Sequence, residues 1–141
     1  MIIADTGFWL AFLDRKDQFH QVACKSMLSL EEGLITTLPV ITETCYFLQA
    51  RVGQAQSVAF LQRLLNGAFS MFPLDDRHMP RMVGLLSQYT DLPMDLADAS
   101  SVVLAEHLGH GRILSTDLRD FHTYRWKNHH PFTNLLEAWI V

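Results

Sequence analysis

Short apolar runs alternate with longer amphipathic segments along most of the chain. The runs span four or five residues, a length typical of buried strands. We expect strands at residues 1–5, 34–37, 69–72 and 112–116. The segments between them place apolar residues three or four positions apart, which is the spacing of one helix face. We expect helices at residues 8–14, 17–30, 39–52, 54–66, 76–90 and 95–107.

Glycine and proline support several of these boundaries. Three predicted helices are closely followed by a glycine, and one begins near a proline, where proline is tolerated. These residues are Gly33, Gly53, Gly109 and Pro39. The pattern weakens after residue 120. We expect a loop at residues 129–134 and either a last strand or a short helix at residues 135–141.

This order of elements predicts an α/β fold. Strands that alternate with helices favour a three-layer α/β/α sandwich whose central sheet of four to five strands is mainly parallel. The sequence has no internal repeat, low-complexity segment or linker, and 141 residues suit one domain. We therefore expect residues 1–141 to form a single domain. In such sheets, functional residues collect beyond the C-terminal ends of the strands.

Composition changes this picture in two ways. Hydrophobic residues make up 49% of the chain and charged residues only 18%, against an average of about 25% charged residues in soluble domains. We therefore expect some apolar surface that a protein partner covers. The net charge of −4 has the wrong sign for a protein that simply coats nucleic acid. It does not exclude a nuclease, because an acidic cluster becomes less negative once it binds a divalent cation.

The cysteines and the N-terminal sequence indicate the cellular compartment of the protein. Cys24 and Cys45 lie in helix-like segments without metal-ligand spacing, so we expect free thiols and a reducing cytoplasm. The apolar N-terminus contains Asp5 and lacks both a basic region and a cleavage motif, which favours a buried strand over a signal peptide. No run of 18 apolar residues exists, so we expect no membrane span.

Two of the predicted strands end in aspartate beside a small hydroxyl residue. Asp5 is followed by Thr6, and Asp117 is preceded by Thr116. Parallel strands end at the same edge of a sheet, so the predicted fold places both carboxylates there.

Two further acids lie in apolar helical segments. Glu43 is in a segment nearly free of charge, and Asp98 comes three residues after Asp95. Crowded carboxylates raise one another's pKa values, so a buried cluster needs a cation. Oxygen ligands select Mg²⁺ or Mn²⁺. Such an ion can lower the pKa of bound water and stabilise an in-line phosphoryl displacement.

The arrangement of these acids resembles the PIN-domain family, and most closely its VapC-like bacterial ribonucleases. The matching segments are IIADTGFWLAFLD, TLPVITETCYFL, LPMDLADASSVVLAEHLG and ILSTDLRDF. Each segment alone is a weak signal, but four of them in the family's order span nearly the whole chain. The sequence after Phe121 is less similar to the family.

The resemblance implies an endoribonuclease that depends on Mg²⁺ or Mn²⁺. Its metal-binding catalytic acids would be Asp5, Glu43, Asp98 and Asp117. The metal would activate a water molecule to attack an RNA phosphodiester, with the 3′-oxygen as the leaving group. Thr6 and Thr116 match hydroxyl positions that help to organise the site. The resemblance also implies the toxin of a toxin–antitoxin pair, with RNA as substrate and an antitoxin that covers the acids. The expected apolar surface is compatible with that cover and with a homodimer.

Several residues have alternative explanations. Asp95 is better explained as a helix N-cap, and Asp98 would then lie at the third helical position, where the helix dipole also favours a carboxylate. Asp120 either assists the site or caps a turn. The seven histidines lack a recognised zinc spacing and are expected on the surface. Phe8, Trp9 and Phe12 are expected in the core or at a dimer surface. The candidates for phosphate contacts are Arg15, Lys16, Arg112, Arg119, Arg125 and Lys127.

Two other classes of function also use such a fold or such aspartates. A catalytically inactive PIN-like module that binds RNA or acts as a scaffold would be expected to lack one of the four acids, and none is missing. A phosphatase of the haloacid-dehalogenase type or a receiver domain also places aspartates at strand ends. The first strand, however, continues as ADTGFW and has no second acid of a D-x-D pair.

Overall fold

The computed structural model describes residues 1–140, and its centre is a five-stranded sheet. The strand order is β3-β2-β1-β4-β7, and every neighbouring pair is parallel. The strands are β1 Ile2–Ala4, β2 Leu34–Thr36, β3 Ser70–Met71, β4 Arg112–Leu114 and β7 Thr133–Asn134. Strand β1 therefore lies between β2 and β4, although β4 is far from both along the chain.

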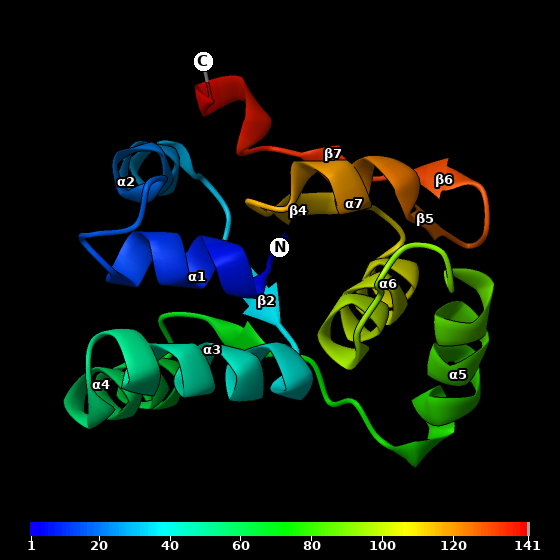
Figure 1. Ribbon diagram of the computed structural model, residues 1–141, viewed down its shortest axis with the longest axis horizontal. Coiled ribbons are helices and arrows are strands. Elements are labelled where there is room, and N and C mark those ends of the chain that lie inside the picture. The colour runs from blue at the N-terminus through cyan, green and yellow to red at the C-terminus, as the bar shows by residue number, and fades with distance from the viewer. Residues whose placement is uncertain (141) are drawn as a thin grey trace.

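Helices cover both faces of this sheet, as Figure 1 shows. One layer contains α1 Thr6–Leu13, α2 His20–Ser29, α3 Leu38–Arg51 and α4 Gln54–Leu65. The other contains α5 Met79–Gln88, α6 Leu96–Leu108 and α7 Leu118–Thr123. The predicted three-layer α/β/α sandwich with a mainly parallel sheet is confirmed.

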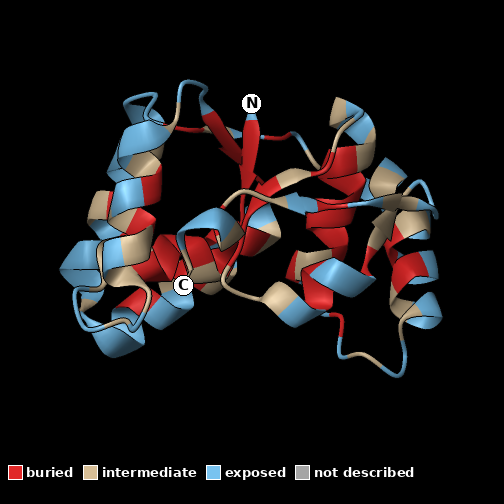
Figure 2. Cartoon of the chain, turned by 90° about the horizontal axis from the view of Figure 1, so that it is seen from above, coloured by how far each residue is buried: buried red, intermediate tan, exposed pale blue. Residues whose placement is uncertain are grey.

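The alternation of side chains along each strand creates two cores. Ile2 and Ala4 pack with the layer of α1 to α4, whereas Ile3 packs with the layer of α5 to α7. Leu114 and Ile113 divide in the same way. Successive strand residues point to opposite faces, and a sheet buried on both faces therefore reads as a continuous apolar run. Figure 2 shows the strands buried between helices whose outer faces are exposed. Phe8 and Trp9 are buried in the first core, as one of the two predicted alternatives required.

Some boundaries differ from the prediction for local reasons. The first helix begins at Thr6, directly after β1 and Asp5. The second begins only at His20, because the Asp17 carboxylate accepts a hydrogen bond from the Phe19 N–H at 2.8 Å and forms a turn. The helix predicted at 76–90 is divided into a 3₁₀ turn, η1 Asp76–His78, and α5.

The C-terminal segment departs most from the prediction. Residues 129–134 were expected to be a loop but contribute β6 His130–Pro131, which pairs antiparallel with β5 Arg125–Trp126, and also β7 of the main sheet. Each of these strands is two residues long, which is too short to show an alternation of apolar and polar residues in the sequence. The expected last element is a 3₁₀ turn, η2 Glu137–Trp139, and Val141 lies outside the described residues.

Cys24 and Cys45 are both free. No helix within residues 1–140 has the length and apolar character that crossing a membrane requires.

Candidate active site

A cleft of about 290 Å³ opens at the edge of the sheet where β1 and β4 end. All eight acidic and hydroxyl residues predicted for the site line this cleft. They are Asp5, Thr6, Glu43, Asp95, Asp98, Thr116, Asp117 and Asp120. The fold therefore brings together residues from both ends of the chain and from four helices.

Asp5 is the most deeply buried of the four predicted catalytic acids. It occupies the N-cap position of α1, but its side chain makes no capping hydrogen bond, so the carboxylate is available to the cleft. The Ser115 hydroxyl donates a hydrogen bond to Asp5 Oδ2 at 3.0 Å. The same hydroxyl oxygen accepts a hydrogen bond from the Asp117 N–H at 3.0 Å. Ser115 therefore fixes the positions of two acids at once.

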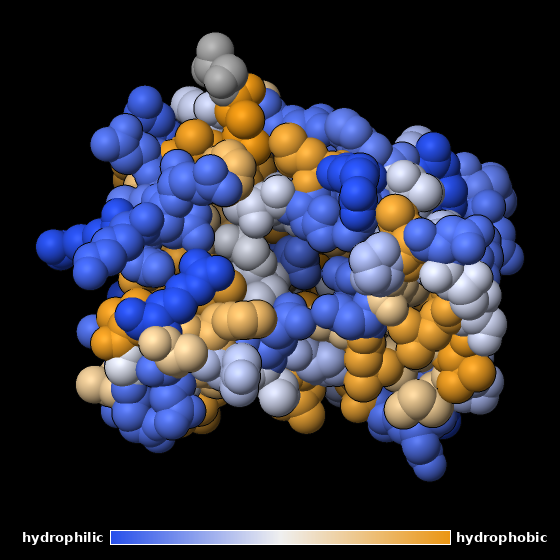
Figure 3. All heavy atoms as spheres, in the orientation of Figure 1, coloured by the Kyte–Doolittle hydropathy of each residue, from blue (hydrophilic) through white to orange (hydrophobic). Residues whose placement is uncertain are grey.

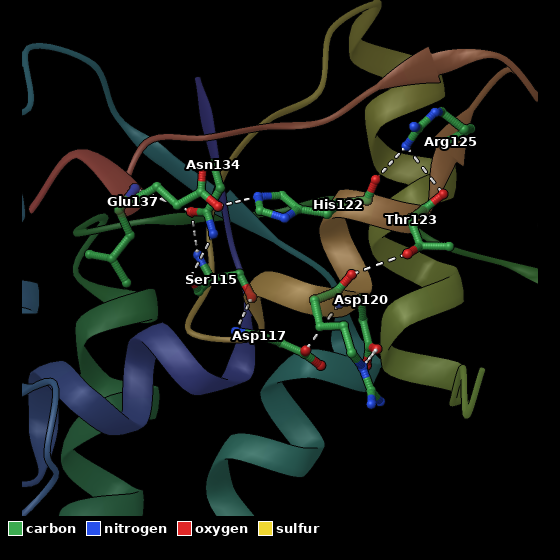
Figure 4. A network of polar contacts seen from close by, with 10 residues as sticks. Ser115, Asp117, Asp120, His122, Thr123, Arg125, Asn134 and Glu137 are labelled. Carbon is green, nitrogen blue, oxygen red and sulfur yellow. Dashed lines mark hydrogen bonds and ion pairs between the residues drawn. The ribbon is translucent and has the colours of Figure 1, made fainter. Parts of the chain in front are cut away.

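Asn134 on β7 holds Ser115 in place, as Figure 4 shows. Asn134 Oδ1 accepts the Ser115 N–H at 3.1 Å, and Asn134 Nδ2 donates to the Ser115 carbonyl at 2.8 Å. Sequence reasoning missed both residues. The hydroxyl bonded to Asp5 belongs to Ser115 rather than to either predicted threonine. Thr116 instead packs against α1, where a side chain at Gly7 would collide with the Thr116 hydroxyl.

The start of α6 supplies two more acids. The Asp98 N–H donates to Asp95 Oδ1 at 2.8 Å, and the Asp95 N–H donates to Asp98 Oδ2 at 3.2 Å. The predicted N-cap role of Asp95 is confirmed, and the two residues form a reciprocal capping box. The buried Tyr124 hydroxyl also donates to Asp98 Oδ2, at 3.4 Å. These contacts orient Asp98 while it lines the cleft.

Glu43 reaches the cleft from α3, and a buried contact fixes that helix against α6. The hydroxyls of Thr37, at the N-cap of α3, and Ser100, on α6, share a hydrogen bond of 2.6 Å. Two helices that pack on different faces of the sheet are thereby joined beside the acids. Glu43 is half-buried and makes no ion pair among the described residues.

The four carboxyl groups are held in an environment that disfavours their charge. Burial, together with the charges of Glu43 and Asp117, raises the pKa of Asp5 to about 7 against the opposing effect of the Ser115 hydrogen bond. Burial and the neighbouring Asp5 and Asp95 raise the pKa of Asp98. Burial also raises the pKa of Glu43 and of Asp117. Perturbed acids in one cleft are typical of a functional site.

Little positive charge offsets this cluster. Within residues 1–140, the only ion pair made by an acid of the cleft joins Arg119 Nε to Asp120 Oδ1 at 3.4 Å. The Arg119 side chain is 75% exposed, so solvent screens its charge. When these acids are ionised, little in the protein balances their negative charge, and a bound cation would neutralise it.

The chemistry of the cleft fits a hard divalent cation. Its donors are carboxylate and hydroxyl oxygens, the ligands that Mg²⁺ and Mn²⁺ prefer. The Thr6 hydroxyl is buried without a hydrogen-bond partner among the described residues. No three histidine, cysteine, aspartate or glutamate side chains within residues 1–140 are placed to hold one metal ion. The fit therefore rests on the donor chemistry and the unbalanced charge, not on a preformed set of ligands.

The role of Ser115 can be tested through stability. Ser115→Ala should lower the free energy of unfolding by about 1–2 kcal/mol, because it removes two buried hydrogen bonds. Urea denaturation would measure the change. Ser101→Ala is the matched control, since the buried Ser101 hydroxyl has no partner among the described residues and its loss should be neutral or stabilising. Equal effects of the two substitutions would contradict this role.

Comparisons with known proteins agree with this fold. The chain matches the PIN domain family over residues 2–127. Ribonuclease VapC26 of Mycobacterium tuberculosis strain H37Rv is 28% identical over 124 residues, which cover 88% of this chain and 92% of that relative. The crystal structure of VapC20 of Mycobacterium tuberculosis, described as a sarcin-ricin loop cleaving toxin, superposes with a TM-score of 0.78 at 21% identity. The superposition covers 83% of this chain and 90% of VapC20.

Proposed function

The chain belongs to the PIN-domain family, and on that premise we propose that it is a divalent-metal-dependent endoribonuclease. One observation carries the proposal: Asp5, Glu43, Asp98 and Asp117 line a single cleft, each with a raised pKa. The name of its relative VapC26, a ribonuclease, supports RNA as the substrate.

These four carboxylates would hold the ion, Mg²⁺ or Mn²⁺. When bound, such an ion lowers the pKa of a water molecule and stabilises charge on a phosphodiester. Ser115 orients Asp5 and the backbone of Asp117, which keeps two of the ligands at the edge of the sheet. Asp95 maintains the first turn of α6 and so the position of Asp98. Thr6, Thr116 and Asp120 would complete the wall of the cleft.

We further propose that the chain is the toxin of a toxin–antitoxin pair. The support is an apolar groove of about 750 Å³ that shares Glu43, Phe47 and Asp95 with the acidic cleft. Its exposed hydrophobic residues are Leu38, Tyr46, Phe47, Met79 and Leu96. Figure 3 shows hydrophobic side chains gathered over α5. An antitoxin and a second copy of the chain, in a homodimer, are the partners proposed for this surface. The free cysteines support the cytoplasm as the location.

The proposed activity can be tested with a mixed structured RNA. The rate of cleavage with Mg²⁺ or Mn²⁺ should exceed the rate in EDTA by more than about tenfold. In EDTA the carboxylates would lack the ion that would activate the attacking water. Gel electrophoresis of end-labelled RNA would measure the rate. The same acids do not read the 2′-hydroxyl, so a DNA of equal sequence belongs in the same experiment.

The sample must contain the chain alone, since a copurified antitoxin would cover the cleft. Mass spectrometry of the intact sample would establish this. Equal cleavage with and without EDTA would show that the activity does not use this site. The absence of cleavage from a pure sample would favour a PIN-like module that binds RNA without cutting it.

A further inference from the structure

A second cleft, of about 660 Å³, lies at the other end of α1 and α3, and its lining contains more cationic residues than acidic ones, of which it has one, Asp14. Four cationic side chains line it: Arg15, Lys16, Arg51 and Arg63. They come from the loop after α1, from the end of α3 and from α4. The whole chain has a net charge of −4, so this concentration of positive charge is a local feature.

Three of these four cations are available to bind an external anion. Arg51 is occupied, since its guanidinium pairs with Asp17 at 3.1 Å and with Asp14 at 3.8 Å. Arg15, Lys16 and Arg63 are exposed and make no ion pair within residues 1–140.

Most arginines elsewhere on the chain are already engaged. Arg81 pairs with Glu106 and Arg112 with Glu32. Arg125 donates hydrogen bonds to three backbone carbonyls. Six lysine and arginine side chains make no ion pair within residues 1–140, and three of these six line the second cleft.

The two clefts are joined by the packed pair of helices α1 and α3. Leu10 of α1 lines the acidic cleft, and Leu13 lines the basic one. On α3, Phe47 lines the acidic cleft and Arg51, one turn further on, lines the basic one. Helix α1 has eight residues and is therefore about 12 Å long. A few nucleotides of single strand cover such a distance. Figure 3 shows strongly hydrophilic side chains gathered at the outer ends of α1 and α3.

We propose that this basic cleft binds backbone phosphates of the RNA strand whose scissile bond lies in the acidic cleft. The inference rests on the proposed function and adds the path of the substrate along α1 and α3. An acidic chain needs such a patch, because attraction to a polyanion comes from local cations rather than from net charge. Contacts of this kind position the strand without reading its sequence.

The test is the salt dependence of RNA binding. A fluorescein-labelled single-stranded RNA of 12 nucleotides would be titrated in EDTA, which prevents cleavage, at several KCl concentrations, with fluorescence anisotropy as the readout. The test variant carries Arg15→Gln, Lys16→Gln and Arg63→Gln. Loss of three phosphate contacts should reduce the slope of log K against log salt by about 2 and weaken binding by about tenfold or more.

A matched control carries Lys25→Gln, Arg77→Gln and Gln88→Glu, three exposed positions that do not line the basic cleft. It changes the net charge equally and should keep the wild-type slope. Equal slopes for the two triple variants would overturn the proposal. The proposal would also be overturned if the test variant kept the wild-type salt slope for RNA but no longer bound polyglutamate. That result would assign the cleft to an acidic protein segment.

The same variants separate this proposal from the proposed nuclease activity. A reduced slope in the test variant, with wild-type protein that does not cut RNA, would support the basic cleft and reject the nuclease. Metal-dependent cleavage, together with equal salt slopes of RNA binding in both triple variants, would support the nuclease activity. It would reject the proposed path of the RNA strand along α1 and α3.

Discussion

Asp98→Asn should reduce the rate of RNA cleavage by about 10³-fold, the size of effect expected when a group essential to the chemical step is lost. Asparagine keeps the shape of the side chain, and its amide oxygen can still accept the hydrogen bond from the Asp95 N–H. The capping box and the fold should therefore persist. What is lost is the negative charge that would hold the divalent ion beside Asp5.

The measurement has two parts. Single-turnover cleavage of RNA gives the rate, and calorimetric titration with Mn²⁺ shows whether metal binding is lost with it. Asp91→Asn is the matched control, because Asp91 is exposed, lies seven positions earlier and does not line the cleft. It should cut at the wild-type rate. Wild-type activity in the Asp98 variant would mean that the cutting belongs to another site or to a contaminant.

The acids could be predicted because their signals are local. Asp5 and Asp117 each end an apolar run, and a parallel sheet places the ends of such runs at one edge. Glu43 is conspicuous as the one charge in an apolar helical segment. For Asp5 and Asp117 the fold class alone predicts the neighbourhood that the structure gives them, whereas the resemblance to the family assigned Glu43 to the site.

Ser115 and Asn134 could not be predicted in this way. Their contact depends on the pairing of β4 with β7, and β7 is only two residues long. The hairpin before it lacks the usual turn signal, since Lys127 and Asn128 adopt positive φ where glycine is common. Only the three-dimensional register shows that the hydroxyl that donates a hydrogen bond to Asp5 belongs to Ser115.

Metal-free protein should lose stability as the pH rises from about 4 to about 7. The unfolded chain ionises Asp5 near pH 3.8, whereas in the folded protein burial raises its pKa to about 7. Between these values the folded state binds the proton and the unfolded state does not, so each rise in pH favours unfolding. The raised pKa values of Asp98 and Asp117 act in the same direction. The contribution of Asp5 to stability is therefore fully present below its pKa in the unfolded chain and is lost as the pH rises through its pKa in the folded protein.

Asp5→Asn should remove its part of this loss. At pH 7.5 in EDTA we expect the variant to be more stable than wild type by about 2 kcal/mol, a rise in Tm of roughly 5–10 °C. Thermal denaturation followed by circular dichroism at pH 5, 6 and 7.5 would measure the difference. Acids with lowered pKa values do not titrate between pH 5 and pH 7.5 and so do not affect this comparison. Glu32 is one example, because Arg112 lowers its pKa to about 2. The lowered pKa of His110 has the opposite effect in this window, but it is common to both proteins and cancels.

Addition of Mn²⁺ separates the electrostatic explanation from a simple packing effect. The ion should stabilise wild type at pH 7.5, because it binds the folded carboxylates, and should do so far less in Asp5→Asn. If the two proteins instead differed equally at pH 5 and pH 7.5, the gain would come from packing rather than from the charge of Asp5. If wild-type stability did not change across the window, the folded cleft would tolerate its carboxylates in ionised form, and it would have no need of a cation to neutralise them.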